Sequence, residues 1–202
     1  MVILTPEQVK ELPAILEGRP IYAPAMIALL TGMRRGELLA LRWSDIDLDR
    51  KVIKIRAALE QTVELGIRFK APKTKSGVRS ISLPDDAVAI LHDHRRQQLE
   101  VRLALGLGKA PDNALVFPAP GTDRLWIPDT FSSAWGDVGV GVTFHALRHT
   151  HASMLIAGGI PITEIAYRLG HASPTTTLSI YAHMYERTDA RAADAINAAL
   201  GK

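Results

Sequence analysis

Six side chains spread along the chain are of the types needed for chemistry at a phosphate. They are Arg34, Lys73, His145, Arg148, His171 and Tyr181. A guanidinium stays protonated and grips two phosphate oxygens at once, so the arginines could clamp the phosphate. A tyrosine could attack the phosphorus if cationic neighbours assist it, because a free phenol has a pKa of about 10. Gathered around one phosphate, this set would cut and rejoin DNA through a tyrosine.

The segment LGHASPTTTLSIYAHMYE carries the candidate nucleophile. It places Tyr181 ten residues after His171, with Pro174 and three threonines between them. This pattern predicts a turn followed by a short helix that begins near Ser173. A lone tyrosine is more often a packing residue, so the catalytic interpretation depends on the other motifs.

The segment FHALRHTHASMLIAGG carries an imidazole and a guanidinium, His145 and Arg148, three residues apart. That spacing places both on one face of a helix. The two glycines that follow, at 158 and 159, predict the end of this helix. His149 and His151 have no evident role, and we expect both to pack or to support their neighbours.

Near the start, ALLTGMRRGELLALRWSDIDLD carries Arg34 three residues before Glu37. This spacing allows the carboxylate to brace the guanidinium. Arg35 lacks such a partner, and we interpret it as a contact with solvent or with a DNA backbone. The apolar residues of the segment predict core positions at Leu38, Leu39, Leu41 and Trp43.

The segment FKAPKTKSGVRSISLP reads as a basic hairpin tip between strands at 52–55 and 79–83. Its cations are Lys70, Lys73, Lys75 and Arg79. A lysine here could protonate a departing alkoxide as general acid. For any one of these cations, contact with a phosphate backbone is the commoner role.

The motifs TGMRRGE, PKTKSG with a following arginine, HALRH, LGH and IYAH occur in this order over about 150 residues. Together they resemble the C-terminal catalytic domain of the tyrosine recombinases, the phage-type integrase family. The resemblance implies a mainly α fold with a small antiparallel β-sheet or hairpin. It implies catalytic roles for the six residues named first, with Lys75 as an alternative to Lys73. We expect DNA contacts from Arg35, Lys70, Lys75 and Arg79.

The resemblance also implies a mechanism. Tyr181 would form a 3′-phosphotyrosyl bond and release a 5′-hydroxyl, while Arg34 and Arg148 neutralise the phosphate oxygens. Lys73 would protonate the leaving oxygen, and His145 would handle the tyrosyl proton. His171 would hydrogen-bond a phosphate oxygen. The covalent bond keeps the energy for rejoining, so no metal, ATP or other cofactor is expected.

The expected partner is double-stranded DNA carrying attachment or crossover sites. We expect a homotetramer on DNA, a monomer free in solution, no membrane association and a location in the bacterial cytoplasm. The 202 residues are predicted to form one catalytic domain, without the core-binding and arm-binding domains that usually precede it. A C-terminal helix at about 187–200, with Ala192, Ile196 and Ala199 at helical spacing, would dock in cis or in trans.

Composition agrees with this interpretation but does not establish it. The net charge is +3, the sequence pI is about 9.3, and 47% of the 202 residues are hydrophobic. These values suit one domain with a substantial core and are compatible with DNA binding. The absence of cysteine excludes disulfides, thiol catalysis and cysteine-ligated zinc. With no run of 18 apolar residues and no signal-peptide pattern, the chain is expected to be soluble and intracellular.

The remaining patterns predict mostly helices. We expect them at 6–17, 22–31, 34–41 and 84–105. The last would expose a solvated face that carries His92, His94, Arg95, Arg96 and Gln97. A Gly- and Pro-rich connection at 106–128 follows, with residues 115–117 as an apolar anchor.

Three other functions fit parts of the sequence. A metal-dependent hydrolase could use His145, His149 and His151, but no carboxylate accompanies them, and residues two apart on a helix diverge. A type IB topoisomerase shares the chemistry, but the motif contexts resemble integrases more closely. The main alternative is a non-catalytic DNA-binding fragment in which Tyr181 is sequestered.

Overall fold

The computed structural model describes residues 2–70, 77–182 and 196–201. Helices predominate in it, together with two small antiparallel sheets. The predicted fold class is thereby confirmed. The helices are α1 Pro6–Leu16, α2 Tyr22–Thr31, α3 Arg35–Leu39, the short 3-10 turn η1 Trp43–Asp45, α4 Asp85–Ala104, α5 Pro128–Gly136, α6 Phe144–Ala157, α7 Ile162–Leu169 and α8 Pro174–Tyr181.

The first sheet has the strand order β1-β2-β5, from Ile46–Asp47, Val52–Ile55 and Arg79–Ser82. Its antiparallel register sets Ile53 opposite Ile81, and both side chains are buried. The predicted pairing of residues 52–55 with those after 79 is therefore confirmed.

A second hairpin corrects the prediction for the segment between these strands. Strands β3 (Ala58–Thr62) and β4 (Gly66–Lys70) pair with each other before the chain returns to β5. The basic segment therefore follows β4 and is not the tip of a simple β2-β5 hairpin. Lys70 ends β4, whereas Lys73 and Lys75 lie outside the described residues.

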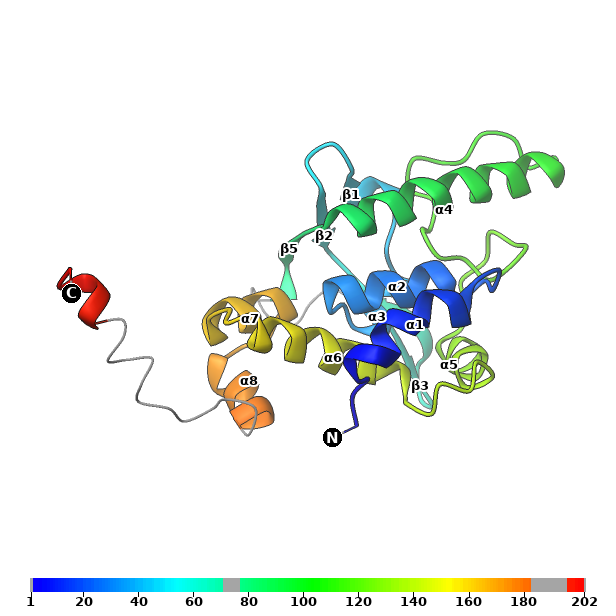
Figure 1. Ribbon diagram of the computed structural model, residues 1–202. Coiled ribbons are helices and arrows are strands. Elements are labelled where there is room, and N and C mark those ends of the chain that lie inside the picture. Colours follow the sequence, from blue (N-terminus) through cyan, green and yellow to red (C-terminus); the bar gives the residue numbers. More distant parts are fainter. Residues whose placement is uncertain (1, 71–76, 183–195, 202) are drawn as a thin grey trace.

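Helix α2 lies at the centre of the main core, between α4 and α6 (Figure 1). Its sequence YAPAMIALLT is apolar around almost its whole circumference, which is typical of a helix buried on all sides. Gly32 ends it with φ of +69°, a left-handed conformation that suits glycine. A Cβ at Gly32 would lie 2.6 Å from the His151 ring. Glycine therefore lets the end of α2 approach α6 closely.

A smaller apolar cluster joins α6, α7 and α8, which lie together in Figure 1. Its buried members are Ala152, Ile156, Ile165, Leu169 and Tyr181. Gly170 ends α7 in a left-handed conformation, and the chain then turns into α8. This cluster holds the segment that carries Tyr181 against the helix that carries Arg148.

Local sequence accounts for how several helices begin. Thr5 and Gln8 form a reciprocal capping box at α1, with distances of 2.9 and 3.3 Å. Ser173 caps α8 by accepting the Thr175 N–H at 3.2 Å, as the sequence predicts. Helix α5 was missed, although the buried pair Phe131 and Trp135 has helical spacing after a proline at the first position.

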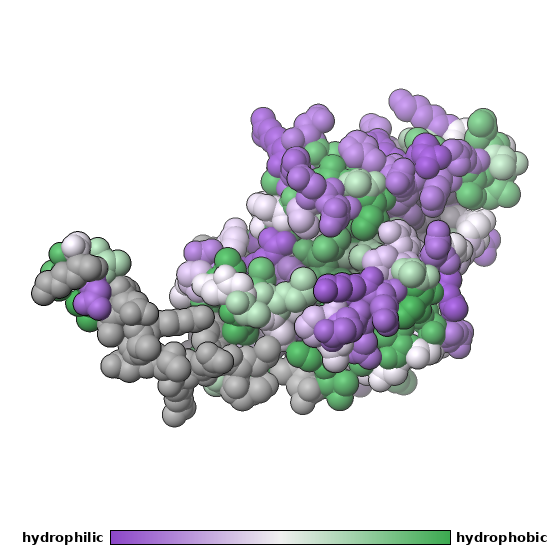
Figure 2. All heavy atoms as spheres, viewed as in Figure 1, coloured by the Kyte–Doolittle hydropathy of each residue, from purple (hydrophilic) through white to green (hydrophobic). Residues whose placement is uncertain are grey.

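The outward face of α4 is largely solvated, as expected. Figure 2 shows hydrophilic residues gathered over α4 and the β1-β2 turn. His94 is an exception and corrects the prediction, because its Nε2 lies 2.6 Å from the Val116 carbonyl oxygen and its ring packs on Phe117. Val116 and Phe117 are buried, so the predicted apolar anchor at 115–117 is confirmed for these two positions.

Two further expectations concern the membrane and the C-terminal helix. Within the described ranges, no helix combines the length and apolarity needed to cross a bilayer. In the tail, Ile196 is 60% exposed and Ala199 is also exposed, while Ala192 lies outside the described residues. Docking of this helix stays a prediction.

Candidate active site

Arg148, one of the two arginines predicted to neutralise the phosphate, is buried. Its side chain leaves α6 and donates from Nη1 to the Gly32 carbonyl oxygen at 2.6 Å and from Nη2 to that of Leu169 at 2.7 Å. Burial, and then the charge of Arg34, lower its pKa to about 9, so it remains a cation at neutral pH. The ends of α2 and α7 thus fix a permanent positive charge in the interior.

His171 lies against this guanidinium. Its Nε2 is 3.0 Å from Arg148 Nη2, and its Nδ1 is 2.6 Å from the Thr177 hydroxyl oxygen. A guanidinium can only donate, so Nε2 accepts and Nδ1 carries the hydrogen. Burial and then the charges of nearby arginines, Arg148 first, lower the His171 pKa to about 4. A donated hydrogen bond from Nε2 to a phosphate oxygen would require the other tautomer.

Arg34 stands at the start of α3 with its side chain 41% exposed. Its Nη1 donates to Glu37 Oε1 at 3.0 Å, and its backbone N–H donates to Oε2 at 2.9 Å. Its Nη2 also reaches the Gly170 carbonyl oxygen at 3.2 Å. The predicted bracing by Glu37 is therefore present, and the cation faces solvent beside the α7-α8 turn.

Arg79 corrects the sequence prediction of a DNA contact. Its side chain has no exposed surface, and Nη1 and Nη2 each donate to one Glu37 oxygen at 2.9 Å. Nε donates to the Arg168 carbonyl oxygen at 2.7 Å. A Cβ at Gly170 would lie 2.7 Å from Nη1, so glycine is needed for this approach. Arg79 is a buried partner of Glu37 and is not available to a DNA backbone in this structure.

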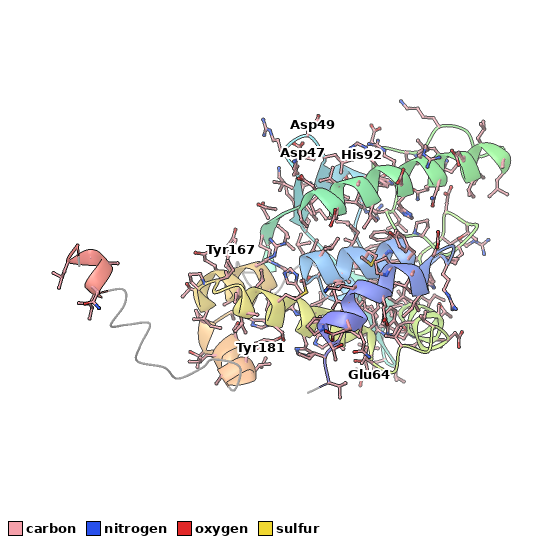
Figure 3. All side chains as sticks on the ribbon, in the orientation of Figure 1. Asp47, Asp49, Glu64, His92, Tyr167 and Tyr181 are labelled. Atoms are coloured by element: carbon pink, nitrogen blue, oxygen red, sulfur yellow. The ribbon has the colours of Figure 1, made fainter. Side chains whose placement is uncertain are left out.

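Tyr181 lies between α8 and α6, whereas the exposed Tyr167 lies on the far side of α7 (Figure 3). The Tyr181 side chain is only 1% exposed. Burial raises its pKa, and the charge of Arg148 opposes that rise. The hydroxyl is therefore protonated at neutral pH, and it must become accessible before it can attack a phosphate.

The imidazole that contacts the Tyr181 hydroxyl is His149, for which the sequence indicated no specific role. His149 Nδ1 is 2.7 Å from the hydroxyl oxygen. His145, the predicted partner of this proton, is exposed and instead packs edge-on against the His149 ring at 4.7 Å between centroids. The i, i+4 spacing of the two histidines predicts their contact, but no sequence signal places His149 beside a residue 32 positions later.

His151 is a packing residue, as expected. Its Nδ1 lies 2.8 Å from the Leu29 carbonyl oxygen, and Arg168 Nε donates to its Nε2 at 3.0 Å. Both ring nitrogens are thus occupied by protein partners. In the part of the chain that the structure describes, no group of three or more His, Cys, Asp or Glu is arranged to hold a metal ion.

The other predicted DNA contacts are engaged within the protein. Arg35 Nη1 donates to the Pro128 carbonyl oxygen at 3.1 Å and to the Ser132 hydroxyl. Lys70 pairs with Glu60 at 2.5 Å on the β3-β4 hairpin. Both side chains are partly exposed, so each could exchange its partner for a phosphate.

The charges of this region favour an anion. Arg34, Arg79 and Arg148 lie around a single carboxylate, Glu37, so two positive charges remain uncompensated among these four side chains. The pKa of Glu37 is lowered even though burial opposes this, because hydrogen bonds and charge from Arg79 and then Arg34 outweigh the burial. A phosphate beside Arg34 and Arg148 would balance the excess positive charge.

Comparison with known proteins places this arrangement in a family. Residues 3–187 match the model of the phage integrase family. The "Tyrosine recombinase XerC-like" protein of Caldanaerobacter subterraneus subsp. tengcongensis is 31% identical over 95% of the chain and 52% of its own length. The "ICEBs1 integrase" of Bacillus subtilis is 31% identical over 85% of the chain and 47% of its own length. The chain therefore spans about half the length of these curated relatives.

A solved structure extends the likeness to the fold. The integrase of the Tn1549 transposon, in complex with transposon right end DNA, superposes with a TM-score of 0.79 at 23% identity. The superposition covers 100% of this chain and 66% of that one. Since the family model covers most of the sequence and the fold agrees, the chain belongs to the phage integrase family.

Proposed function

We propose that this chain is the catalytic part of a site-specific tyrosine recombinase, which cuts and rejoins double-stranded DNA through a 3′-phosphotyrosyl intermediate. One observation carries the proposal. A tyrosine hydroxyl, a buried guanidinium, a more exposed guanidinium and a histidine converge on one region, although they come from separate helices and turns. These residues are Tyr181, Arg148, Arg34 and His171.

In the proposed reaction, a DNA phosphate enters beside Arg34 and Arg148. The partly exposed Arg34 meets it first, and Arg148 supplies a fixed charge that needs no reorganisation during the reaction. The Tyr181 oxygen attacks phosphorus, and the P–O5′ bond breaks as the P–O(Tyr) bond forms. The later attack of a 5′-hydroxyl on the phosphotyrosine reverses these steps and rejoins the DNA without ATP.

The leaving 5′ oxygen needs a proton, and Lys73 is proposed as the donor, with Lys75 as the alternative. Both lie outside the described residues, so their assignment rests on the sequence motif. His145 is proposed to contact the phosphate from the exposed side of α6, one turn before His149. His171 supports Arg148 and, in its other tautomer, would donate to a phosphate oxygen.

The partners of the protein are also proposals. Relatives are called a tyrosine recombinase and an integrase, and the Tn1549 integrase was solved with transposon DNA. By analogy, we propose double-stranded crossover DNA as substrate, with Arg35 and Lys70 as backbone contacts. We further propose that four copies assemble on recombining DNA, that the free protein is monomeric, and that it acts in the cytoplasm on the host's DNA.

The test is covalent capture of DNA in EDTA. The protein is incubated with a nicked suicide substrate of its own crossover sequence, from which the freed 5′ fragment diffuses away. A denaturation-resistant adduct is expected with the natural chain and with Tyr167→Phe, which alters an exposed tyrosine on α7. Tyr181→Phe should give none.

Three other outcomes would each contradict one part of the proposal. DNA binding without any adduct would contradict the catalytic proposal and favour the non-catalytic DNA-binding fragment. An adduct that persists in Tyr181→Phe would contradict the choice of nucleophile. Loss of the adduct in EDTA alone would contradict the metal-independent mechanism.

A further inference from the structure

We propose that His149 is a further catalytic residue, which orients the Tyr181 hydroxyl and accepts its proton when the tyrosine attacks. The proposal rests on the function proposed above and assigns one step of it. It replaces the sequence-based expectation that His145 handles this proton. The observation that carries it is the direct contact of His149 with the attacking oxygen.

The contact between His149 and Tyr181 has the distance of a strong hydrogen bond. The 2.7 Å between His149 Nδ1 and the Tyr181 oxygen is short for a bond between oxygen and nitrogen. The two ring centroids are 5.9 Å apart, with the ring planes inclined by 58°. His149 lies within α6 directly after Arg148, so one helix supplies both the phosphate clamp and the contact to the nucleophile.

His145 supports this arrangement from the other side of His149. Its ring meets the His149 ring edge-on, at an interplanar angle of 87° and 4.7 Å between centroids. This packing limits rotation of the His149 ring and keeps Nδ1 directed at Tyr181. Within the described residues, the Tyr181 hydroxyl has His149 as its hydrogen-bond partner.

The protonation states suit a transfer from tyrosine to histidine. Burial, then His145 and then Arg148 lower the His149 pKa to about 4, so the ring is neutral at pH 7. The phenol keeps its proton, because burial raises its pKa. A neutral imidazole with its hydrogen on Nε2 offers the Nδ1 lone pair to that proton. The charged and titratable side chains that act on His149 are His145 and Arg148 from α6, His171 from the α7-α8 turn and Tyr181 from α8.

Binding of DNA would make His149 a stronger base. A phosphate anion beside Arg148 offsets the positive charge that disfavours protonation of the ring. During attack, the proton leaves the Tyr181 oxygen for Nδ1 while the P–O(Tyr) bond forms and the P–O5′ bond breaks. The leaving oxygen takes its proton from the general acid. In the rejoining step the attacking 5′-hydroxyl returns its proton to the group that acted as general acid, and the proton on Nδ1 returns to the tyrosine oxygen, so no proton is gained or lost over the cycle.

The closing experiment compares single-turnover cleavage of the suicide substrate from pH 6 to pH 10. His149→Asn keeps an acceptor oxygen near the position of Nδ1 but cannot take up a proton. We expect it to cleave about 10²–10⁴-fold more slowly at pH 7, the usual contribution of a general base. Its rate should then rise tenfold per pH unit as hydroxide removes the phenolic proton. His92→Asn, on the exposed face of α4, is the matched control and should keep the natural rate.

Two comparisons distinguish proton transfer from Tyr181 to His149 from the role of His145 and from protonation of the leaving oxygen. His145→Asn should slow cleavage without changing the shape of the pH profile. A substrate with sulfur in place of the 5′ bridging oxygen has a leaving group that needs no proton, since a thiol has a pKa of about 8.5. It should rescue Lys73→Ala but not His149→Asn.

The outcomes distinguish the inference from the function on which it rests. No adduct with the natural chain would contradict the proposed function. An adduct with the natural chain, together with a natural rate and pH profile in His149→Asn, would overturn the role of His149 alone. If the variant does not fold, ¹⁵N NMR of the unaltered protein decides: hydrogen on Nε2 is expected, and hydrogen on Nδ1 would overturn the inference.

Discussion

Replacing Glu37 with glutamine should destabilise the protein strongly, because Glu37 compensates a fully buried cation. Its side chain is 6% exposed, and both its oxygens accept from Arg79 at 2.9 Å. Two unit charges about 4 Å apart attract by about 4 kcal/mol at an effective dielectric constant of about 20. Removing one partner of a buried pair costs about 3–5 kcal/mol, since the other charge is left uncompensated.

For a chain of this size, that loss corresponds to a fall in Tm of roughly 6–20 °C. The assay is thermal and urea unfolding at pH 7, followed by circular dichroism. Glu100→Gln is the matched control, because Glu100 pairs with Arg96 on the exposed face of α4, and its Tm should not change. Replacing both Glu37 and Arg79 with methionine should recover most of the loss, because Arg79 no longer leaves a buried charge unpaired and Arg34, the other partner of Glu37, is 41% exposed.

The pH dependence of Glu37→Gln follows from the lowered pKa of the carboxyl group. Its ordinary value is 4.5, and the folded state holds it below that. The stabilisation is therefore present above pH 4.5 and is lost as the pH falls through the lower folded value. The difference in stability between the natural chain and the variant should shrink below about pH 4.5. A difference under about 1 kcal/mol at pH 7 would refute the importance of the buried pair.

Three further substitutions test the elements that position the site. Gly32→Ala should lower the free energy of unfolding by about 1–3 kcal/mol, because φ is +69° and the new Cβ would clash with the His151 ring. Urea titration measures this, and an unchanged midpoint would contradict it. Arg148→Lys should slow cleavage by about 10²–10³-fold, since one ammonium cannot bind the Gly32 and Leu169 carbonyl oxygens and also hold a phosphate. Cleavage at the natural rate would refute this. Ser173→Ala should weaken the start of α8 by about 0.5–2 kcal/mol, which amide exchange would detect as lost protection at Thr175; unaltered protection would argue against the cap.

The parts of the site that depend on neighbouring residues could be predicted from the sequence. Arg34 and Glu37 are three residues apart and meet within one helical turn. The caps at Thr5 and Ser173 are likewise local, so residue type and spacing were sufficient. The positions of α1, α2, α4 and α6 followed from the residues that typically begin and end helices.

Contacts between residues far apart in the chain could not be predicted from residue type and spacing. The Arg79–Glu37, His149–Tyr181 and Arg148–His171 pairs join residues 42, 32 and 23 positions apart. A basic residue near a hairpin is as compatible with a DNA contact as with a buried ion pair until the packing of β5 against α7 is known. For the same reason the sequence predicts a DNA contact for Arg79 and gives His149 no specific role.

The β3-β4 hairpin was missed for a different reason. Strand GIRFK has only two apolar side chains in alternation and is mostly exposed, and strand ALEQT shows no apolar alternation, so neither gives the clear signal of a half-buried strand. Their cross-strand pairs are mixed, with the ion pair of Glu60 and Arg68 beside the apolar pair of Leu59 and Phe69. Only one buried residue, Leu59, anchors β3 beside α3 within the described part of the hairpin.

The most direct test of the central claim is to identify the amino acid that carries the DNA. The adduct from the suicide substrate is digested with nuclease and protease, and the nucleotide-bearing peptide is sequenced by tandem mass spectrometry. The proposed mechanism predicts a 3′-linked nucleotide phosphate on Tyr181 and on no other residue. A phosphate on the neighbouring Tyr185, or on any serine or histidine, would contradict the assignment of Tyr181 as the nucleophile.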